Sequence, residues 1–182
     1  MSTTRYPASI AWLHWLIAVL IFAAIGLGLS MVDLPFSPTK IRWYSWHKWL
    51  GITVLVLAAV RLLLRRRAIL PGPVAMPDWQ RKLAAGAHHF LYLMMFAIPL
   101  SGWMYSSAAG VPVVYLGVLP LPNLMPVDKQ WAAVLKTVHT LLNYTMFVIL
   151  AAHIAGALKH QFVDRDGLLM RMLPWPPRKR AG

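Results

Sequence analysis

Four long apolar segments constrain this chain more than any other feature. They cover about residues 10–31, 46–64, 83–105 and 132–158. Each is close to the ~20 residues that an α-helix needs to cross the hydrocarbon core of a bilayer. The chain has 182 residues, 59% of them hydrophobic, which leaves room for four such helices and short connections. The sequence therefore predicts an all-α integral membrane protein, with residues 1–182 forming one domain, a bundle of four transmembrane helices.

Basic residues at the ends of these segments account for the net charge of +13. Membrane proteins concentrate lysine and arginine on their cytoplasmic side, so this charge does not indicate a nucleic-acid partner. Four spans place both termini and the 65–82 loop on the same side of the membrane. That side then carries most of the 18 basic residues. The sequence therefore predicts that both termini are cytoplasmic. The residues on this side are Arg5, Arg65, Arg66, Arg67, Arg81, Lys82, Lys159, Arg165, Arg171, Arg178, Lys179 and Arg180.

Two other segments need an interpretation. No small-residue cleavage site follows the first apolar segment, so we expect a retained helix there and not a signal peptide. The 106–131 connection is apolar but contains four prolines, which makes it too broken for a span. We expect it to form an apolar cap at the outer surface, with or without a short interfacial helix.

Two histidines in the last apolar segment, His139 and His153, are the strongest indication of function. They are 14 residues apart, which corresponds to ~21 Å along a helix axis. Fourteen steps of ~100° return to within ~40° of the starting direction, so both rings face the same way. A histidine inside a membrane span is costly and usually functional. This spacing indicates two haems stacked along one helix, one near each membrane surface.

Bis-histidine ligation requires a second imidazole at the same depth for each haem. His47, at the start of the second apolar segment, matches His139 near the outer surface. His14 matches His153 near the inner surface, but His88 in the third segment lies at a similar depth. Depth therefore predicts one outer pair and leaves two candidates for the partner of His153. The alternative is that these histidines only form hydrogen bonds between helices, and it is much harder to reconcile with four residues at matched depths.

Cysteine and glutamate are both absent. Without cysteine there are no disulfides, thiolate metal sites, iron–sulfur clusters or covalently attached haems. The five acidic residues are aspartates outside the apolar segments, whereas proton pumps and cation-coupled transporters normally carry a carboxylate within the membrane. The sequence therefore disfavours a transporter, and any haem must be bound noncovalently.

Several short segments, in this order, give nearly the whole chain a resemblance to the bacterial cytochrome b561 family. They are AWLHWL around His14, WHKWLG around His47 followed by VRLLLR, HHFLYLMMFAIPLSGW in the third apolar segment, VHTLLNY at His139, AAHIAGALKHQF at His153, and RDGLLMRMLP. The resemblance implies a dihaem protein of the bacterial inner membrane. It also implies that His14 and His153 hold the inner haem b, that His47 and His139 hold the outer one, and that His88 is not a ligand.

Basic residues near these histidines are candidates for contacts with haem propionates or an anionic substrate. Arg61 is 14 residues after His47, one haem spacing deeper. It would pair with an inner propionate, or else extend its charge to the cytoplasmic surface. Three more cations lie at the outer surface: Lys40, Arg42 and Lys48. They would pair with outer propionates or attract a small anion, or else form an ordinary solvated loop.

Three residues are candidates for a quinone site near the inner haem. His88 would line such a pocket or bond to a propionate. Lys159 and His160 lie just beyond the inner haem's level, where they would contact a quinone carbonyl or serve as interfacial anchors.

Two histidine ligands leave each iron without a free position, which favours electron transfer at the haem edge over binding of oxygen. The resemblance to the cytochrome b561 family implies a quinone as one redox partner. We expect an oxidoreductase that carries electrons between the periplasmic face and membrane quinone, with ubiquinone as partner. Family members that oxidise superoxide and reduce ubiquinone make superoxide the leading specific substrate. The alternatives are an anchor subunit for a periplasmic dehydrogenase or hydrogenase, and a membrane protein without haem. The sequence leaves the oligomeric state open, and a homodimer is compatible with it.

Overall fold

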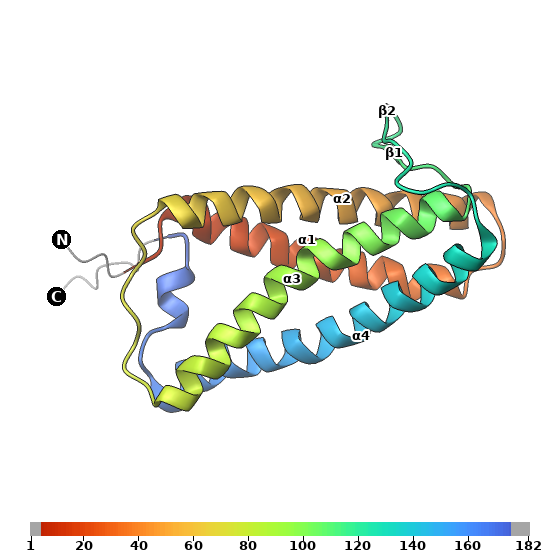
Figure 1. The fold of residues 1–182 in the computed structure, drawn as a ribbon. Helices are drawn as coiled ribbons and strands as arrows, with labels where there is room; N and C mark the ends of the chain where they lie inside the picture. Colours follow the sequence, from red (N-terminus) through yellow and green to blue (C-terminus); the bar gives the residue numbers. More distant parts are fainter. Residues whose placement is uncertain (1–4, 176–182) are drawn as a thin grey trace.

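The computed structural model describes residues 5–175, and within them four long helices run side by side (Figure 1). The helices are α1 (Ala8–Val32), α2 (Pro38–Arg67), α3 (Asp78–Ala108) and α4 (Lys129–Lys159). All four are long and apolar enough to cross a membrane. This confirms the predicted four-helix membrane bundle.

The helices extend beyond the predicted apolar segments, most of all at the start of α2. Hydropathy predicts that His47 lies at the start of the second helix. The helix instead begins at Pro38, so His47 lies about 2.5 turns inside it. The Ser37 side chain accepts a hydrogen bond from the backbone N–H of Lys40 (3.2 Å), and proline suits the first helical turn. Hydropathy identifies only the part of a helix that contacts lipid, whereas capping groups determine where the helix begins.

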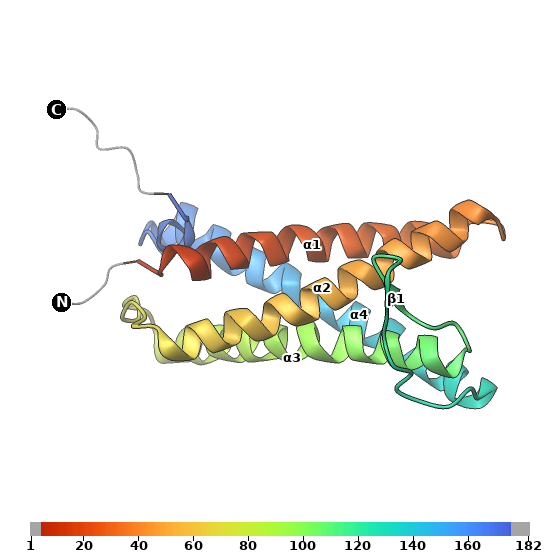
Figure 2. The same cartoon turned by 90° about the horizontal axis from the view of Figure 1, so that it is seen from above.

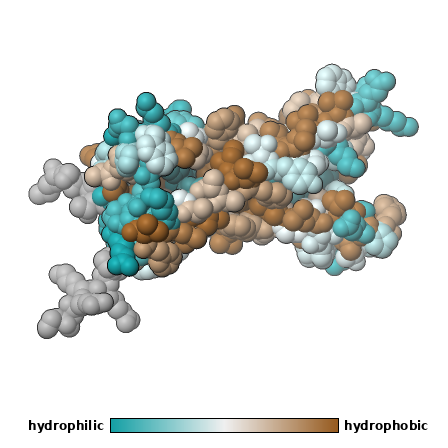
Figure 3. Space-filling model, turned by 90° about the horizontal axis from the view of Figure 1, so that it is seen from below, coloured by the Kyte–Doolittle hydropathy of each residue, from teal (hydrophilic) through white to brown (hydrophobic). Residues whose placement is uncertain are grey.

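The helices pack as two pairs, α1 with α2 and α3 with α4, and α2 joins the pairs through α3. A small buried core lies where the four meet, formed by Ile17, Val54, Ala58, Met94, Met95 and Met146. Many other large apolar side chains are exposed on the outside of the bundle. Figure 3 shows apolar side chains along the middle of the bundle and hydrophilic ones at its two ends. This distribution is the one that a bilayer around the bundle requires.

The connection between α3 and α4 forms a β-hairpin and, within the described residues, no interfacial helix. Strands β1 (Val114–Tyr115) and β2 (Leu119–Pro120) pair antiparallel around a turn in which Gly117 has φ +77°. The Trp49 indole of α2 donates a hydrogen bond to the Val114 carbonyl (2.7 Å). The hairpin is therefore fixed to the side of α2, near one end of the bundle (Figure 2), which we call the hairpin end.

The other end of the bundle, which we call the termini end, carries the start of α1 and the end of α4 (Figure 1). After α4 the chain continues as a π-helical turn (His160–Asp164) and a short 3₁₀ helix (Leu169–Met172). The backbone N–H of Tyr6 donates to the Arg171 carbonyl (3.1 Å), and the Trp15 indole donates to the Met172 carbonyl (3.0 Å). The predicted basic residues Arg178, Lys179 and Arg180 lie outside the described residues.

Candidate haem sites

At the hairpin end, the structure brings together His47 of α2 and His139 of α4. Their ring centres are 6.2 Å apart. Two metal–nitrogen bonds of about 2.0 Å, plus about 1.1 Å from each nitrogen to its ring centre, would place two opposed imidazoles about 6.2 Å apart. The pair therefore has the separation that one iron between two imidazoles requires.

Both rings at the hairpin end are oriented by backbone carbonyls of a neighbouring helix. His47 Nδ1 lies 3.0 Å from the Ala24 carbonyl oxygen of α1, and His139 Nδ1 lies 3.1 Å from the Ile98 carbonyl oxygen of α3. A carbonyl oxygen only accepts hydrogen bonds, so Nδ1 must carry the proton. The Nε2 lone pair of each ring is then left for a metal, the arrangement usual for metal-ligating histidines.

A cavity of about 590 Å³ adjoins these two rings. Its volume lies within the ~300–1,000 Å³ typical of cofactor and ligand sites. The lining is mainly apolar, and it includes the side chains of His47, His139, Lys40 and Lys48. An apolar cavity lined by two imidazoles and two lysines suits a macrocycle that carries propionates.

Two of the three predicted outer-surface cations already have backbone partners. Lys40 Nζ donates to the carbonyl of Val32, the last residue of α1, and to that of Leu34, two residues later. Lys48 Nζ donates to the Val111 carbonyl (3.2 Å) ahead of the hairpin. Their charges still line the cavity, whereas Arg42 is exposed at the surface.

At the termini end, three histidines gather from three helices. The ring centres of His14 (α1) and His153 (α4) are 6.2 Å apart, the same separation as in the other pair. The ring of His88 (α3) is 5.3 Å from that of His153. The shorter separation is less than two opposed metal-bound imidazoles need. The structure therefore groups all three residues, and His14 has the separation that fits ligation.

Arg61 of α2 is only 7% exposed. Its guanidinium donates to the Ile10 carbonyl (3.4 Å) and to the Tyr92 hydroxyl, and it lies over the Tyr92 ring. Neither group is charged, and among residues 5–175 no carboxylate lies within ion-pair distance of Arg61. This burial disfavours a side chain that extends to the surface. It leaves a buried cation that suits an anionic cofactor group.

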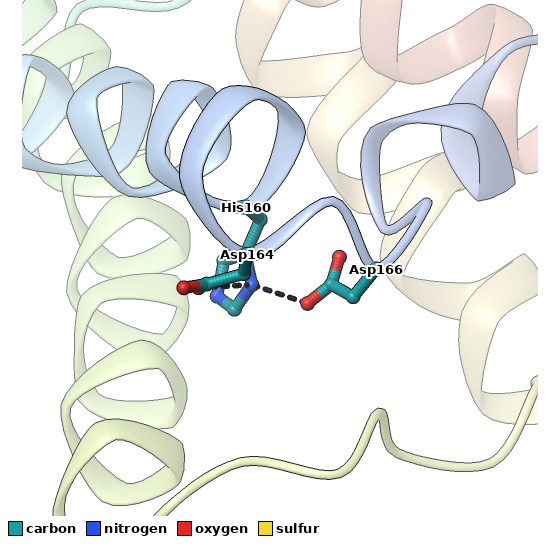
Figure 4. A group of neighbouring side chains, drawn as sticks. All are labelled: His160, Asp164 and Asp166. Atoms are coloured by element: carbon teal, nitrogen blue, oxygen red, sulfur yellow. Dashed lines mark hydrogen bonds and ion pairs between the residues drawn. The ribbon is translucent and has the colours of Figure 1, made fainter.

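His160, which directly follows α4, lies beside Asp164 and Asp166 (Figure 4), and Lys159, the last residue of α4, joins this ionic cluster. His160 Nδ1 donates to Asp166 (2.6 Å) and lies 3.3 Å from an oxygen of Asp164. Lys159 Nζ pairs with Asp164 (2.6 Å). Two of the three residues predicted for a quinone site, Lys159 and His160, thus already have carboxylate partners. The third, His88, is left as the candidate beside the termini-end histidines.

The sequence interpretation missed several residues around the rings. Gly28 and Gly102 lie against His47 and His139, and the hydroxyl oxygen of Ser101 is 3.0 Å from His139 Nδ1. The available signal was the small-residue pair Ser101–Gly102 inside an otherwise bulky apolar segment. Glycine within a predicted helix often marks a close approach of another group.

Residues 5–175 match the family model described as prokaryotic cytochrome b561. The chain belongs to this family. It is 34% identical over 174 residues to cytochrome b561 homolog 2 of Escherichia coli (strain K12), covering 93% of this chain and 91% of that protein. It is 30% identical to cytochrome b561 homolog 1 of the same organism, covering 93% and 97%. It is 29% identical to the probable superoxide oxidase CybB of Yersinia pestis, covering 93% and 96%.

Membership of the cytochrome b561 family agrees with the geometry of the two histidine groups. It makes the chain a bacterial membrane protein of the haem b class, with a role in electron transfer. The predicted family and the predicted redox class are thereby confirmed.

Proposed function

We propose that this cytochrome b561 holds two b-type haems and carries electrons across the bacterial inner membrane. One haem would lie between His47 and His139, and the other between His14 and His153. The observation that carries the proposal is the common ring-centre separation of 6.2 Å in both pairs. Two unrelated histidine contacts would have no reason to share the separation that iron ligation needs.

Haem b supplies one-electron redox chemistry at its iron when it is bound. The protein's part is to hold the four imidazoles, to surround the site at the hairpin end with apolar side chains, and to supply cations for the propionates. Arg61 would serve the site at the termini end. Lys40 and Lys48, which line the cavity, would serve the other.

The orientation follows from the distribution of basic residues. With both termini in the cytoplasm, the hairpin end and its histidine pair would face the periplasm. His139 and His153 lie ~21 Å apart along α4, so the two sites would serve opposite membrane surfaces.

We further propose superoxide as the electron donor and ubiquinone as the acceptor. One relative is named a probable superoxide oxidase, and cations lie at the hairpin end where a small anion would arrive. Two superoxide anions would each lose one electron and become dioxygen. One ubiquinone would take up these two electrons and two protons to become ubiquinol. His88 is the proposed quinone-side residue at the termini end.

The haem assignment is tested by counting haems per chain in single histidine variants. We expect about two haems in the native protein and about one in each of His14→Ala, His47→Ala, His139→Ala and His153→Ala, because each variant would lack one of the two histidines that would hold a haem. His88→Ala should keep both. Loss of a haem in His88→Ala, with both retained in His14→Ala, would overturn the termini-end pairing.

The substrate assignment is tested by stopped-flow mixing of the oxidised protein with superoxide. Haem reduction should be fast at low salt and slower in a Lys40/Arg42/Lys48→Gln triple variant. Lys129→Gln with Lys136→Gln is the control, because it removes charge from the same end outside this cluster. Equal rates of haem reduction in the native protein, the triple variant and the control would reject the proposal that these cations attract superoxide. A dihaem protein that superoxide does not reduce would point to the alternative donor, a periplasmic dehydrogenase or hydrogenase.

A further inference from the structure

We infer that Gly28 and Gly102 are positioning residues of the His47–His139 site. Each glycine would keep open the space in which a histidine ring reaches a backbone carbonyl. The inference rests on the proposed haem between these two histidines and adds residues that the ligand set itself does not identify.

The two rings meet their neighbouring helices in the same way. His47 bonds to the carbonyl of Ala24, and the residue four positions later in α1 is Gly28. His139 bonds to the carbonyl of Ile98, and the residue four positions later in α3 is Gly102. The same pairing of carbonyl and glycine therefore occurs once for each ring, on two different helices.

This spacing has a physical cause. In an α-helix the carbonyl of residue i already accepts from the N–H of residue i+4, and its second lone pair remains free. A ring that donates to that lone pair must lie close to the side chain of residue i+4. Only glycine leaves the approach fully open.

The distances show how little room there is. A Cβ at Gly28 would lie 3.2 Å from His47 Cε1 and 3.5 Å from its Nδ1. A Cβ at Gly102 would lie 3.0 Å from His139 Cε1 and 3.2 Å from its Nδ1. Ordinary van der Waals contacts between carbon atoms are ~3.5–4.0 Å, so both rings would have to move, His139 more than His47.

Ser101 restricts the His139 ring further. Its hydroxyl donates to the Ile98 carbonyl (2.8 Å), so the hydroxyl oxygen is left to accept from His139 Nδ1 at 3.0 Å. Ser101 is a buried residue, 7% exposed. The His139 N–H is therefore shared between two acceptors, and its ring has less freedom to shift than that of His47.

Other helical glycines do not share this environment. A Cβ at Gly26, Gly86 or Gly156 would meet no atom within 4 Å. Gly26 lies in α1, two residues before Gly28, and is thus a matched control with the same helix and the same substitution.

The test compares Gly102→Ala, Gly28→Ala and Gly26→Ala by haem content, redox titration and low-spin EPR spectra. Alanine is intrinsically preferred to glycine in a helix, so a loss cannot be attributed to helix propensity. We expect Gly102→Ala to lower the affinity for the haem of the His47–His139 site about 10–100-fold, which is the usual effect of losing contacts that orient a metal ligand. Gly28→Ala should have a smaller effect on the same haem, and Gly26→Ala should match the native protein.

The second haem serves as an internal standard for folding, because it should keep its content, potential and EPR signal in every variant. Native behaviour of Gly102→Ala would overturn the inference. Equal loss of both haems in Gly102→Ala would also overturn it, because a general packing defect would then be the cause. A native protein without haem would instead reject the proposed function, so the two failures are distinguishable.

Ser101→Ala is the second variant, and it introduces no steric clash. Loss of an acceptor for the His139 N–H makes the ligand a weaker donor, so the potential of that haem should rise. Thr145→Val in α4 is the control, because among residues 5–175 the Thr145 hydroxyl bonds only to the Leu141 carbonyl. An unchanged potential in Ser101→Ala would reject the part assigned to the serine.

Discussion

Arg61 shows how a single residue constrains the termini-end site. Its charge is buried, and its partners, the Ile10 carbonyl and the Tyr92 hydroxyl, are neutral. A buried charge is costly unless it is paired, so the site is energetically incomplete without an anion. A haem propionate beside His14 and His153 would supply that anion.

The corresponding prediction is that Arg61→Gln lowers the potential of the inner haem. A nearby cation stabilises the reduced, less positively charged haem, and its loss favours the oxidised form. For charges ~8 Å apart at an effective dielectric constant of ~20, the effect is on the order of 2 kcal/mol.

A redox titration of both haems measures this effect. Arg61→Lys should keep most of the native potential, and Arg66→Gln, at an exposed position of the same helix, should leave it unchanged. A native potential in Arg61→Gln would mean that this cation does not lie near the haem.

At the scale of elements, the C-terminal segment ties the end of α4 to the start of α1. Asp166 accepts from His160 Nδ1 (2.6 Å) and from the backbone N–H of Leu168 (2.9 Å). In the segment that follows, the Met172 carbonyl accepts a hydrogen bond from the indole N–H of Trp15. Trp15 is the residue directly after His14 in α1. The turn after α4 thus supports the helix that supplies one of the inner candidate ligands.

We predict that Asp166→Ala loosens this segment. Loss of a hydrogen bond to a carboxylate costs about 1.5–3 kcal/mol, enough to make local opening more frequent. Trypsin should then cleave at Arg171 faster in the detergent-solubilised protein. Asp78→Ala is the control, because Asp78 forms an exposed ion pair with Arg81, and such pairs contribute little to stability. Equal cleavage rates in both variants would contradict the role given to Asp166.

At the scale of the whole molecule, the apolar middle and polar ends define a membrane orientation that labelling can test. The chain contains no cysteine, so a single introduced thiol reports its own position. Val118 in the hairpin is 81% exposed, and Ala75 lies exposed between α2 and α3. We predict that an impermeant maleimide labels Val118→Cys, and not Ala75→Cys, in intact spheroplasts.

Labelling of Ala75→Cys alone would reverse the proposed orientation, and the hairpin-end site would then face the cytoplasm. Permeabilised cells provide the control, because both thiols should react there. The physical basis of the prediction is the excess of lysine and arginine at the termini end.

The sequence by itself determined the four spans and the depth of the histidines, because hydropathy and the 3.6-residue period are local properties of a helix. It did not determine where α2 begins, because the Ser37 cap lies outside the apolar segment that hydropathy detects. Nor did it show that 106–131 forms a hairpin fixed to Trp49.

Only the tertiary structure decided which groups surround each ring. Depth alone could not separate His14 from His88 as the partner of His153, since both lie near the same level. The ring of His14 is 6.2 Å from that of His153 and the ring of His88 is 5.3 Å from it, and these separations depend on how the helices are rotated and packed. The same holds for Gly102, which matters because it lies against His139, a residue 37 positions away in the sequence. Periodicity along one helix predicts which way a side chain faces, and only packing between helices determines what it meets there.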